Sequence, residues 1–368
     1  MSNGAPAFFE GTEKRIEIDF AGDGDLRKVD MSDWKEVVHL SATQILNHKE
    51  GSKFTSFLLS ESSLIVYPKK AVIKTCGQTT PIGSVAKIMS AAKGVGMEPE
   101  WLCYSRKNFL SPAEQPAEHQ SMVVETAFCR KACGGIGDAF VLGPMTGEHW
   151  FVYDANFKLR DCTKTGDFQL DMMMYGLPND VQQVFHTSEP EGSRAGATAM
   201  TKASGLGDII SSIGGEVDDY CFDKCGYSCN IHAGDAYAMV HVTPQESCSY
   251  ASFETNIGST HIGSDQIGAT IGADISGSLD TLVGGVLDCF RPERVTITLF
   301  IDKGALEAVD NAPFKAAERR YKQKNCTSTH FEQDYLAIIA NFAREPGQKR
   351  ALEPRAPGPP PAKVGRGS

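Results

Sequence analysis

The order of strand-like and helix-like segments most constrains how this chain can fold. Apolar alternation and β-branched runs come in groups of neighbouring segments, and a helix-like segment separates the groups. Strands that follow one another directly favour an α+β fold with antiparallel sheets over a strictly alternating βαβ chain. The predicted strands are Lys14–Phe20, Glu36–Ser41, Lys53–Leu59, Ser63–Tyr67, Ala71–Thr75, Ser121–Phe128, His149–Asp154, Ala236–Thr243, Ser249–Glu254 and Arg294–Asp302.

The remaining segments divide into helices, one ambiguous segment and loosely structured stretches. Helices are predicted over Thr80–Lys93, Asp167–Met174 and Leu279–Phe290, whereas His330–Ala343 fits either a helix or a strand. Gly258–Gly277 is rich in Gly, Ser and Thr and is predicted to be loosely structured. The tail at 346–368 is rich in Pro, Gly, Lys and Arg, so we expect it to be disordered and the fold to be a single domain over 1–345. Inspection by eye finds no internal repeat.

Composition excludes several function classes. Apolar residues make up 41% of the 368 residues and charged residues 22%, as in a globular protein with a large core. The net charge of −10 argues against a nucleic-acid or anionic-membrane surface and is compatible with a cationic ligand. No apolar stretch is long enough to span a bilayer, and Met1–Pro6 does not begin a signal peptide. Eleven cysteines without a secretory address predict free thiols in the cytoplasm.

A group of evenly spaced cysteines invites a metal interpretation. Cys221, Cys225 and Cys229 lie four residues apart, which fits neither a C-x2-C pair nor the usual iron–sulfur spacings. The histidines also lack zinc-site spacing. The sequence therefore predicts no metal site, and a thiol enzyme or cysteine-ligated metal protein is kept only as an alternative.

Five short motifs are individually weak, because each one alone reads as a turn, a strand end or a loop. In chain order they are Phe8–Lys14 (FFEGTEK), Leu59–Leu64 (LSESSL), Lys74–Gly77 (KTCG), Cys225–Ser228 (CGYS), and His241–Pro244 (HVTP) continuing to Ser249–Glu254 (SYASFE). Tyr104–Phe109 (YSRKNF) and Thr298–Phe300 (TLF) add to the set.

In this order and spacing, over about Phe8 to Phe342, these motifs resemble the eukaryotic S-adenosylmethionine decarboxylase family, most nearly its protozoan branch. The resemblance implies an αββα sandwich, in which two antiparallel β-sheets flanked by helices form two similar halves. It also implies decarboxylation of S-adenosylmethionine for spermidine and other polyamine synthesis.

Decarboxylating an α-amino acid requires a carbonyl that accepts the electrons of the broken C–C bond. The family makes this carbonyl, a covalent pyruvoyl group, from its own backbone. Composition leaves Ser60, Ser62 and Ser63 open as the source, and the resemblance selects Ser62. Its Oγ would attack the carbonyl of Glu61, and the resulting ester would eliminate to dehydroalanine and then to pyruvoyl and ammonia. The products would be a small chain, 1–61, and a large chain, 62–368.

The resemblance also assigns roles during processing and turnover. His241 would take the Cα proton of residue 62, and Ser228 would hydrogen-bond the processing intermediate. The substrate amine would form a Schiff base with the pyruvoyl group, and Cys76 would return a proton to the substrate α-carbon. Glu10 and Glu13 are expected near the active centre.

The substrate offers a sulfonium cation and an adenine, both of which suit aromatic faces. The resemblance places Phe9 and Phe222 on either side of the adenine, and Leu59 and Glu61 in the same binding set. Gln245 stands where most relatives have a glutamate that holds the ribose hydroxyls. An amide can accept from one hydroxyl and donate to the other, so we expect weaker binding rather than none.

Some family members bind putrescine as an activator in a buried cluster of acids. The matching positions here are Glu17, Lys74, Asp167, Asp171, Glu254 and Phe300. Buried acids without a counter-cation are unstable, so either putrescine binds or local basic groups replace it. The family also forms homodimers or, in protozoa, heterodimers with a catalytically inactive paralogue.

A non-catalytic regulatory paralogue of the same fold is the alternative function. It is disfavoured because Glu61, Ser62, Cys76, Ser228 and His241 are all present.

Overall fold

The molecule is built on a pair of antiparallel β-sheets of eight strands each. The computed structural model describes residues 13–158, 168–245, 248–257, 275–302, 312–331 and 335–345. Sheet A has the order β2 (Ile45–Glu50), β3 (Thr55–Leu59), β4 (Ser62–Val66), β5 (Lys70–Thr75), β1 (Lys14–Gly22), β6 (Met97–Lys107), β8 (Trp150–Asn156), β7 (Asp138–Leu142). Sheet B has the order β10 (Glu216–Cys221), β11 (Tyr227–Ala233), β12 (Ala236–Thr243), β13 (Tyr250–Thr255), β9 (Phe168–Tyr175), β14 (Arg294–Asp302), β16 (Tyr335–Ala343), β15 (Lys322–Phe331).

The two halves of the chain repeat one topology. Adding eight to each strand number of sheet A gives the strand order of sheet B, from β2 and β10 at one edge to β7 and β15 at the other. The predicted sandwich of two similar halves is therefore confirmed, although the repeat is not visible by eye in the sequence.

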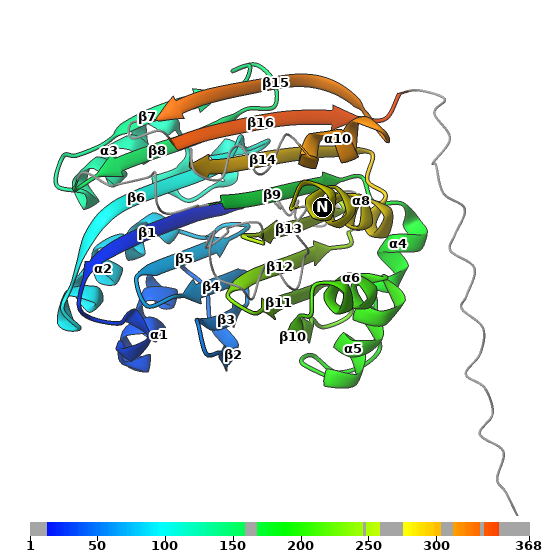
Figure 1. The fold of residues 1–368 in the computed structure, drawn as a ribbon, viewed down its shortest axis with the longest axis horizontal. Coiled ribbons are helices and arrows are strands. Elements are labelled where there is room, and N and C mark those ends of the chain that lie inside the picture. Colours follow the sequence, from blue (N-terminus) through cyan, green and yellow to red (C-terminus); the bar gives the residue numbers. More distant parts are fainter. Residues whose placement is uncertain are drawn as a thin grey trace, which may run out of the picture.

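Helices cover the outer face of each sheet (Figure 1). Those beside sheet A are α1 (Met31–Leu40), α2 (Val85–Gly94) and α3 (Met122–Ala132). The same half of the chain contains the short 3-10 turns η1 (Leu26–Lys28), η2 (Pro81–Ser84), η3 (Pro112–Glu114) and η4 (Ala117–His119). Those beside sheet B are α4 (Asn179–Val184), α5 (Arg194–Ala203), α6 (Leu206–Ser212), α8 (Ile275–Phe290) and α10 (Ala312–Glu318).

Separate apolar cores lie on the outer faces and between the sheets. One core joins sheet A to its helices and a larger one joins sheet B to its helices. Between the sheets, the described residues form two apolar clusters, one around Trp150 and Phe300 and one around Phe54 and Met239. Polar and charged side chains occupy positions between the sheets as well, and these include the candidate site.

Three predicted elements are wrong. Asp167–Met174 was predicted as a helix but forms strand β9, with Asp167 outside the described residues. Glu36–Ser41 and Ser121–Phe128 were predicted as strands but lie mainly in helices α1 and α3.

The physical reasons are visible in the caps and the burial. Asp30 accepts a hydrogen bond from Ser32 N–H at the start of α1, and Ser121 accepts one from Val124 N–H at the start of α3. The buried side chains of α1 recur at helical spacing, and its valine pair is simply part of that buried face. Both faces of β9 are buried, so its sequence does not need to alternate between polar and apolar residues. Its run of methionines therefore lacks the pattern by which a strand is recognised.

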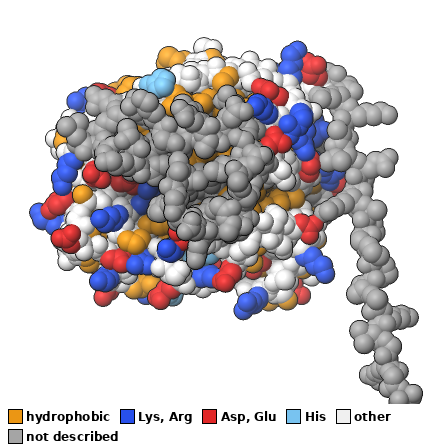
Figure 2. Space-filling model, in the orientation of Figure 1, with side chains coloured by type: hydrophobic (Ala, Val, Ile, Leu, Met, Phe, Trp, Pro, Cys, Tyr) orange, Lys and Arg blue, Asp and Glu red, His pale blue; other side chains and the backbone are white. Residues whose placement is uncertain are grey.

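The other predicted strands and helices are confirmed within a few residues at their ends. The ambiguous segment His330–Ala343 is strand, being the end of β15 and all of β16. Most of Gly258–Gly277 and the whole tail at 346–368 lie outside the described residues. Acidic and basic side chains are interspersed on the face drawn in Figure 2.

Truncating the side chain of Leu287 tests the packing of α8 on sheet B. Leu287 is 1% exposed, so Leu287→Ala should lower the free energy of unfolding by about 2–5 kcal/mol in a denaturant titration. Leu110→Ala is the control, because Leu110 is 58% exposed and its loss should change stability by less than about 0.5 kcal/mol. Equal losses for the two variants would contradict the packing described.

Candidate active site

Ser62 sits in a strained backbone conformation at the start of β4. It follows the two-residue connection Ser60–Glu61 of the β3–β4 hairpin, and its φ of 122° is in a region that L-residues rarely adopt. Such a conformation costs on the order of 1–3 kcal/mol. The Ser62 hydroxyl is buried and finds no hydrogen-bond partner among the described residues. The hydroxyl predicted from the sequence to be the nucleophile is thus unengaged, on a residue whose backbone is strained.

The carbonyl of Glu61 is held by the turn that follows β5. Cys76 N–H donates to the Glu61 oxygen at 3.1 Å, and the Cys76 thiol lies 3.6 Å from the Glu61 side-chain Oε2. On the other side, Glu61 N–H donates to Thr43 Oγ1 at 3.2 Å. A backbone N–H already directed at the carbonyl oxygen would stabilise an oxyanion formed there.

A neutral histidine faces this hairpin from sheet B. His241 on β12 is the cross-strand partner of Ser228 on β11, and its Nδ1 lies 2.9 Å from Ser228 Oγ. Its Nε2 lies 3.3 Å from Ser63 Oγ, which donates to Asn230 Oδ1 at 2.7 Å. Burial, with the charge of Lys74 adding to it, lowers the pKa of His241 to about 3. An uncharged imidazole can accept a proton, as a general base must.

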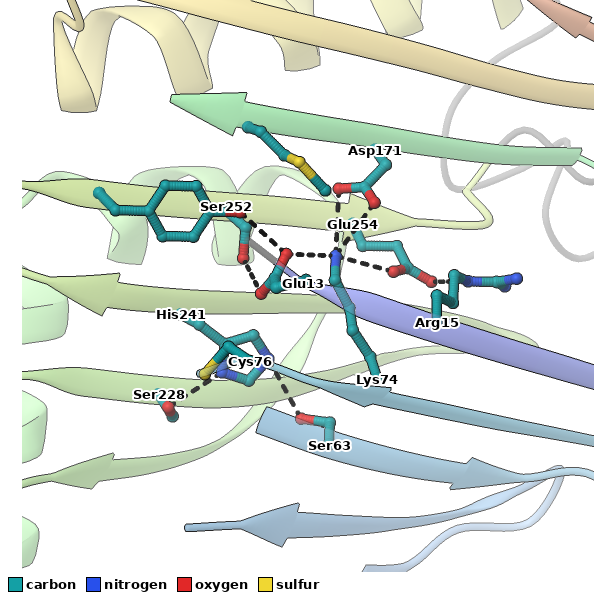
Figure 3. A network of polar contacts seen from close by, with 12 residues as sticks. Glu13, Arg15, Ser63, Lys74, Cys76, Asp171, Ser228, His241, Ser252 and Glu254 are labelled. Carbon is teal, nitrogen blue, oxygen red and sulfur yellow. Dashed lines mark hydrogen bonds and ion pairs between the residues drawn. The ribbon is translucent and has the colours of Figure 1, made fainter. Parts of the chain in front are cut away.

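The Cys76 side chain is kept as a thiol. Burial raises the pKa of Cys76 well above its ordinary value, and the carboxylates of Glu61 and Glu13 raise it further. Figure 3 draws Cys76 in the same close-up as His241 and Ser228. A protonated thiol at this place can act as a general acid.

A cluster of buried charges lies beside these groups and joins the two sheets (Figure 3). The ammonium of Lys74, on β5, lies 2.9 Å from Glu13 Oε2, 3.1 Å from both carboxylate oxygens of Asp171 and 2.9 Å from Glu254 Oε2. Arg15 pairs with Glu254 at 2.9 Å and with Glu17 at 2.6 Å. All of these side chains are almost completely buried.

The cluster continues in both directions. Glu17 also pairs with Lys70, which lies 3.5 Å from Asp19 and is partly exposed. At the other end Glu13 accepts hydrogen bonds from Ser252 Oγ at 2.7 Å and Tyr250 OH at 3.0 Å. The cluster thus runs from Ser252, the cross-strand partner of His241, to the partly exposed Lys70.

Acids outnumber cations in this cluster, and the pKa values respond. Burial raises the pKa of Asp171. The charge of Lys74 lowers it, and the charges of Glu254 and Glu13 raise it again in part. Burial acts the same way on Glu254, but Lys74 and Arg15 together lower its pKa. Of Asp171 and Glu254, Asp171 is therefore the carboxyl that more readily takes up a proton.

The structure brings together most, but not all, of the residues predicted from the sequence. Ser62, Glu61, Cys76, Ser228, His241 and Glu13 lie around the hairpin, and Glu17, Lys74, Asp171 and Glu254 lie in the charged cluster. Phe300 is buried in the apolar packing between the sheets. Phe9, Glu10 and Asp167 lie outside the described residues.

The predicted substrate-binding residues differ in how they can reach a ligand. The side chain of Leu59 is buried in the core on the helix side of sheet A, so only its main chain could contact a ligand. Phe222 is half-buried in the β10–β11 connection, against Tyr220. Gln245 is exposed beyond the end of β12, where its Oε1 lies 3.3 Å from the Cys248 thiol.

Sequence reasoning missed several members of the site. Arg15 and Ser252 are the clearest cases, because each hydrogen-bonds an acid of the cluster. Arg15 lies two residues from both Glu13 and Glu17, and this spacing on a strand puts all three side chains on one face. That alternation was a usable signal.

The alternative metal interpretation rested on three cysteines that the structure spreads over β10, β11 and their connection. Cys221 Sγ lies 3.3 Å from the carbonyl oxygen of Ser193. Burial raises the pKa of Cys229 to about 12. In the described part of the chain no group of three or more metal-ligating side chains is found. No helix within the described ranges is long and apolar enough to cross a bilayer.

The duplicated sandwich carries a strained, buried Ser62 on one sheet and a neutral His241 on the other, an arrangement in which a self-processing reaction is chemically feasible. The family model for adenosylmethionine decarboxylase matches residues 6–343, and the chain belongs to that family.

Relatives from several kingdoms agree with this assignment. S-adenosylmethionine decarboxylase proenzymes are 31% identical over 348 residues in Dictyostelium discoideum (91% of this chain, 85% of that protein) and 30% over 353 residues in Trypanosoma cruzi (92% and 89%). The Oryza sativa subsp. japonica proenzyme is 35% identical over 308 residues (79% and 72%). The solved structure of the Trypanosoma brucei AdoMetDC-delta26 monomer matches with a TM-score of 0.57 and 25% identity, covering 77% of this chain and 99% of that one.

The low pKa of His241 has a consequence for stability. Between pH 6.5 and about 3 the unfolded chain binds a proton at this residue that the folded chain excludes, so stability falls as pH falls through this window. In the uncut Ser62→Ala background, His241→Asn should reduce the slope of unfolding free energy against pH by up to about 1.4 kcal/mol per pH unit. His39→Asn, at an exposed position on α1, should leave the slope unchanged. An unaltered slope in His241→Asn would mean that the imidazole is not held neutral.

Proposed function

We propose that this protein is a pyruvoyl-dependent S-adenosylmethionine decarboxylase that generates its pyruvoyl group from Ser62. The observation that carries the proposal is the strained, buried Ser62, which follows a carbonyl bound by Cys76 N–H and precedes Ser63, the residue that the neutral His241 contacts. The reaction would release CO2 and decarboxylated S-adenosylmethionine, the aminopropyl donor for spermidine synthesis. Localisation in the cytoplasm remains a prediction from the sequence.

Self-processing uses groups of this chain and one water molecule. Ser62 Oγ attacks the Glu61 carbonyl carbon, and the oxyanion that forms is stabilised by Cys76 N–H. The C–N bond then breaks, the proton lost by the Ser62 hydroxyl passes to the freed amine nitrogen, and an ester remains. His241, aligned by Ser228, then takes the Cα proton of residue 62. Strain at Ser62 favours the step, because rearrangement releases a conformation that the folded hairpin otherwise has to maintain.

In turnover the chain positions the substrate and controls one proton. When present, the pyruvoyl carbonyl would accept the electrons of the breaking C–C bond. Cys76, held as a thiol by burial and by neighbouring carboxylates, carries the proton that the substrate α-carbon needs after CO2 leaves. Phe222 and Gln245 come from connections of sheet B that flank β11 and β12, and we assign them to the adenine and the ribose. Phe9, Glu61 and the main chain of Leu59 complete the proposed binding set, and Glu10 is assigned to the active centre beside them.

Cleavage is the most direct test. The purified wild-type chain should give two masses, 1–61 and 62–368, with the larger fragment blocked to Edman degradation. Ser62→Ala should remain in one piece, and Ser60→Ala, two residues earlier in the same hairpin, should give both fragments. Cleaved protein should release labelled CO2 from carboxyl-labelled S-adenosylmethionine. A wild-type chain that stays intact and releases no CO2 would reject this function in favour of a non-catalytic paralogue.

The charged cluster bears on activation by putrescine. Lys74 and Arg15, with Lys70 at the outer end, already supply positive charge to the acids for which a diamine would otherwise be the counter-cation. Arg15 contacts Glu17 and Glu254, two of the positions assigned to the putrescine site. Of the two outcomes expected from the sequence, we favour replacement of putrescine by local basic groups. The predicted homodimer, or heterodimer with an inactive paralogue, rests on the family resemblance alone.

Replacing Arg15 tests whether putrescine or the local basic groups neutralise the buried acids. The wild-type enzyme should have full activity without putrescine, whereas Arg15→Leu should lose at least ~10-fold, because three buried acids then share Lys74. Millimolar putrescine should restore part of the Arg15→Leu activity. Arg27→Leu, which removes a more exposed arginine paired with Asp25, is the matched control and should behave as wild type. A wild-type enzyme that is inactive until putrescine is added would contradict this interpretation.

A further inference from the structure

Self-cleavage changes the charge at Glu61, a consequence that rests on the proposed function. When the Cα proton of residue 62 leaves, the Cβ–Oγ bond of the ester breaks and its electron pair remains on the main-chain carboxylate of Glu61. Water then replaces the nitrogen of the dehydroalanine, which leaves as ammonium. A neutral peptide carbonyl thus becomes an anion at the end of the small chain.

The surroundings of Glu61 are unfavourable for an additional anion. Glu61 is half-buried, and burial already raises the pKa of its side-chain carboxyl. The carboxylate of Glu13 acts on the same region, since it raises the pKa of Cys76 together with Glu61. A new carboxylate at this place requires a nearby positive charge.

Lys14 lies in the right place to provide that charge. Its side chain is completely buried, and its Nζ donates to the carbonyl oxygen of Gly77 at 2.6 Å. Gly77 directly follows Cys76, whose N–H holds the Glu61 carbonyl oxygen. In sheet A the cross-strand register aligns Lys14 with Thr75, and Thr75 with Ser62. The ammonium, the turn after β5 and the cleavage point are therefore neighbours.

Two further observations support an electrostatic role for Lys14. Burial raises the pKa of the Glu61 carboxyl and of the Cys76 thiol, and the charge of Lys14 opposes this rise in both, so its field reaches both residues. The ring of Phe109 lies 5.3 Å from Lys14 Nζ and 4.2 Å from the guanidinium carbon of Arg106. This ring limits the room that the ammonium has to turn away from the hairpin.

We propose that Lys14 stabilises the carboxylate that cleavage creates at the C-terminus of the small chain, and so keeps that end seated beside Cys76. Lys14 belongs to β1, which is itself part of the small chain. The ion pair therefore ties the new end of the small chain to its own central strand. Lys14 acts through the position of Glu61 and Cys76, which makes it a positioning residue.

A thermodynamic cycle tests the proposal without relying on activity. Lys14→Met is made in the self-cleaving chain and in the uncut Ser62→Ala chain, cleavage is verified by intact mass, and melting temperatures are compared. Loss of the Gly77 hydrogen bond lowers both melting temperatures, but the cleaved protein should lose ~5 °C more, since only it contains the carboxylate. Lys107→Met is the control: Lys107 is also a buried lysine of sheet A, paired with Glu148, and its loss should be equal in both backgrounds.

The other outcomes are decisive as well. Equal losses for Lys14→Met in a verified cleaved and an uncut chain would overturn the Lys14 proposal while leaving the proposed function intact. A folded Lys14→Met chain that is never cleaved would overturn it too, because Lys14 would then be needed before the carboxylate exists. If Lys14→Met fails to fold in both backgrounds, Lys14→Arg decides: retention of charge should give equal melting shifts in the two backgrounds, and a larger loss in the cleaved protein would refute the proposal. A wild-type chain that is not cleaved removes the proposed function and this inference together.

Discussion

The contact of one buried ammonium with carboxylates from both sheets is the constraint on which the rest of the site depends. Lys74 on sheet A meets Asp171 and Glu254 on sheet B, and Glu13 at the start of β1. Removing these charges from water is costly, and the cost is offset only when all partners are in place. The cluster therefore fixes the relative position of the two sheets at the point where the serine of one must meet the histidine of the other.

The duplicated topology explains how the reactive groups come to face one another. Hairpin β3–β4 of sheet A corresponds to hairpin β11–β12 of sheet B in strand order. The first carries the strained Ser62, and the second carries Ser228 and His241. Equivalent hairpins of two face-to-face sheets thus supply complementary parts of one site, and neither half contains the site alone.

The sequence predicted those residues and strands that belong to a recognisable motif or a polar–apolar pattern. The reactive residues were identified by resemblance, since Ser62 and Cys76 have no distinguishing local pattern of their own. Strand β9 was missed because its outer and inner faces are both buried, which leaves Met172–Met174 without polar alternation. Arg15 was overlooked as a partner because the charged face of β1 resembles a solvated strand edge until sheet B is known to cover it.

The alternation of β1 gives its first residues two separate tasks. Glu13 and Arg15 face sheet B and pair within the charged cluster, whereas Lys14, on the opposite face, bonds the turn that holds Cys76. Strand β1 is also hydrogen-bonded between β5 and β6, in the middle of sheet A. A cut after Glu61 would leave this strand in place, because its two ladders do not involve the cleaved bond. The charged cluster and the turn that holds Cys76 are thus both attached to a central strand of the small chain. Backbone cleavage would therefore alter the chemistry at residue 62 and preserve the sheet that positions the site.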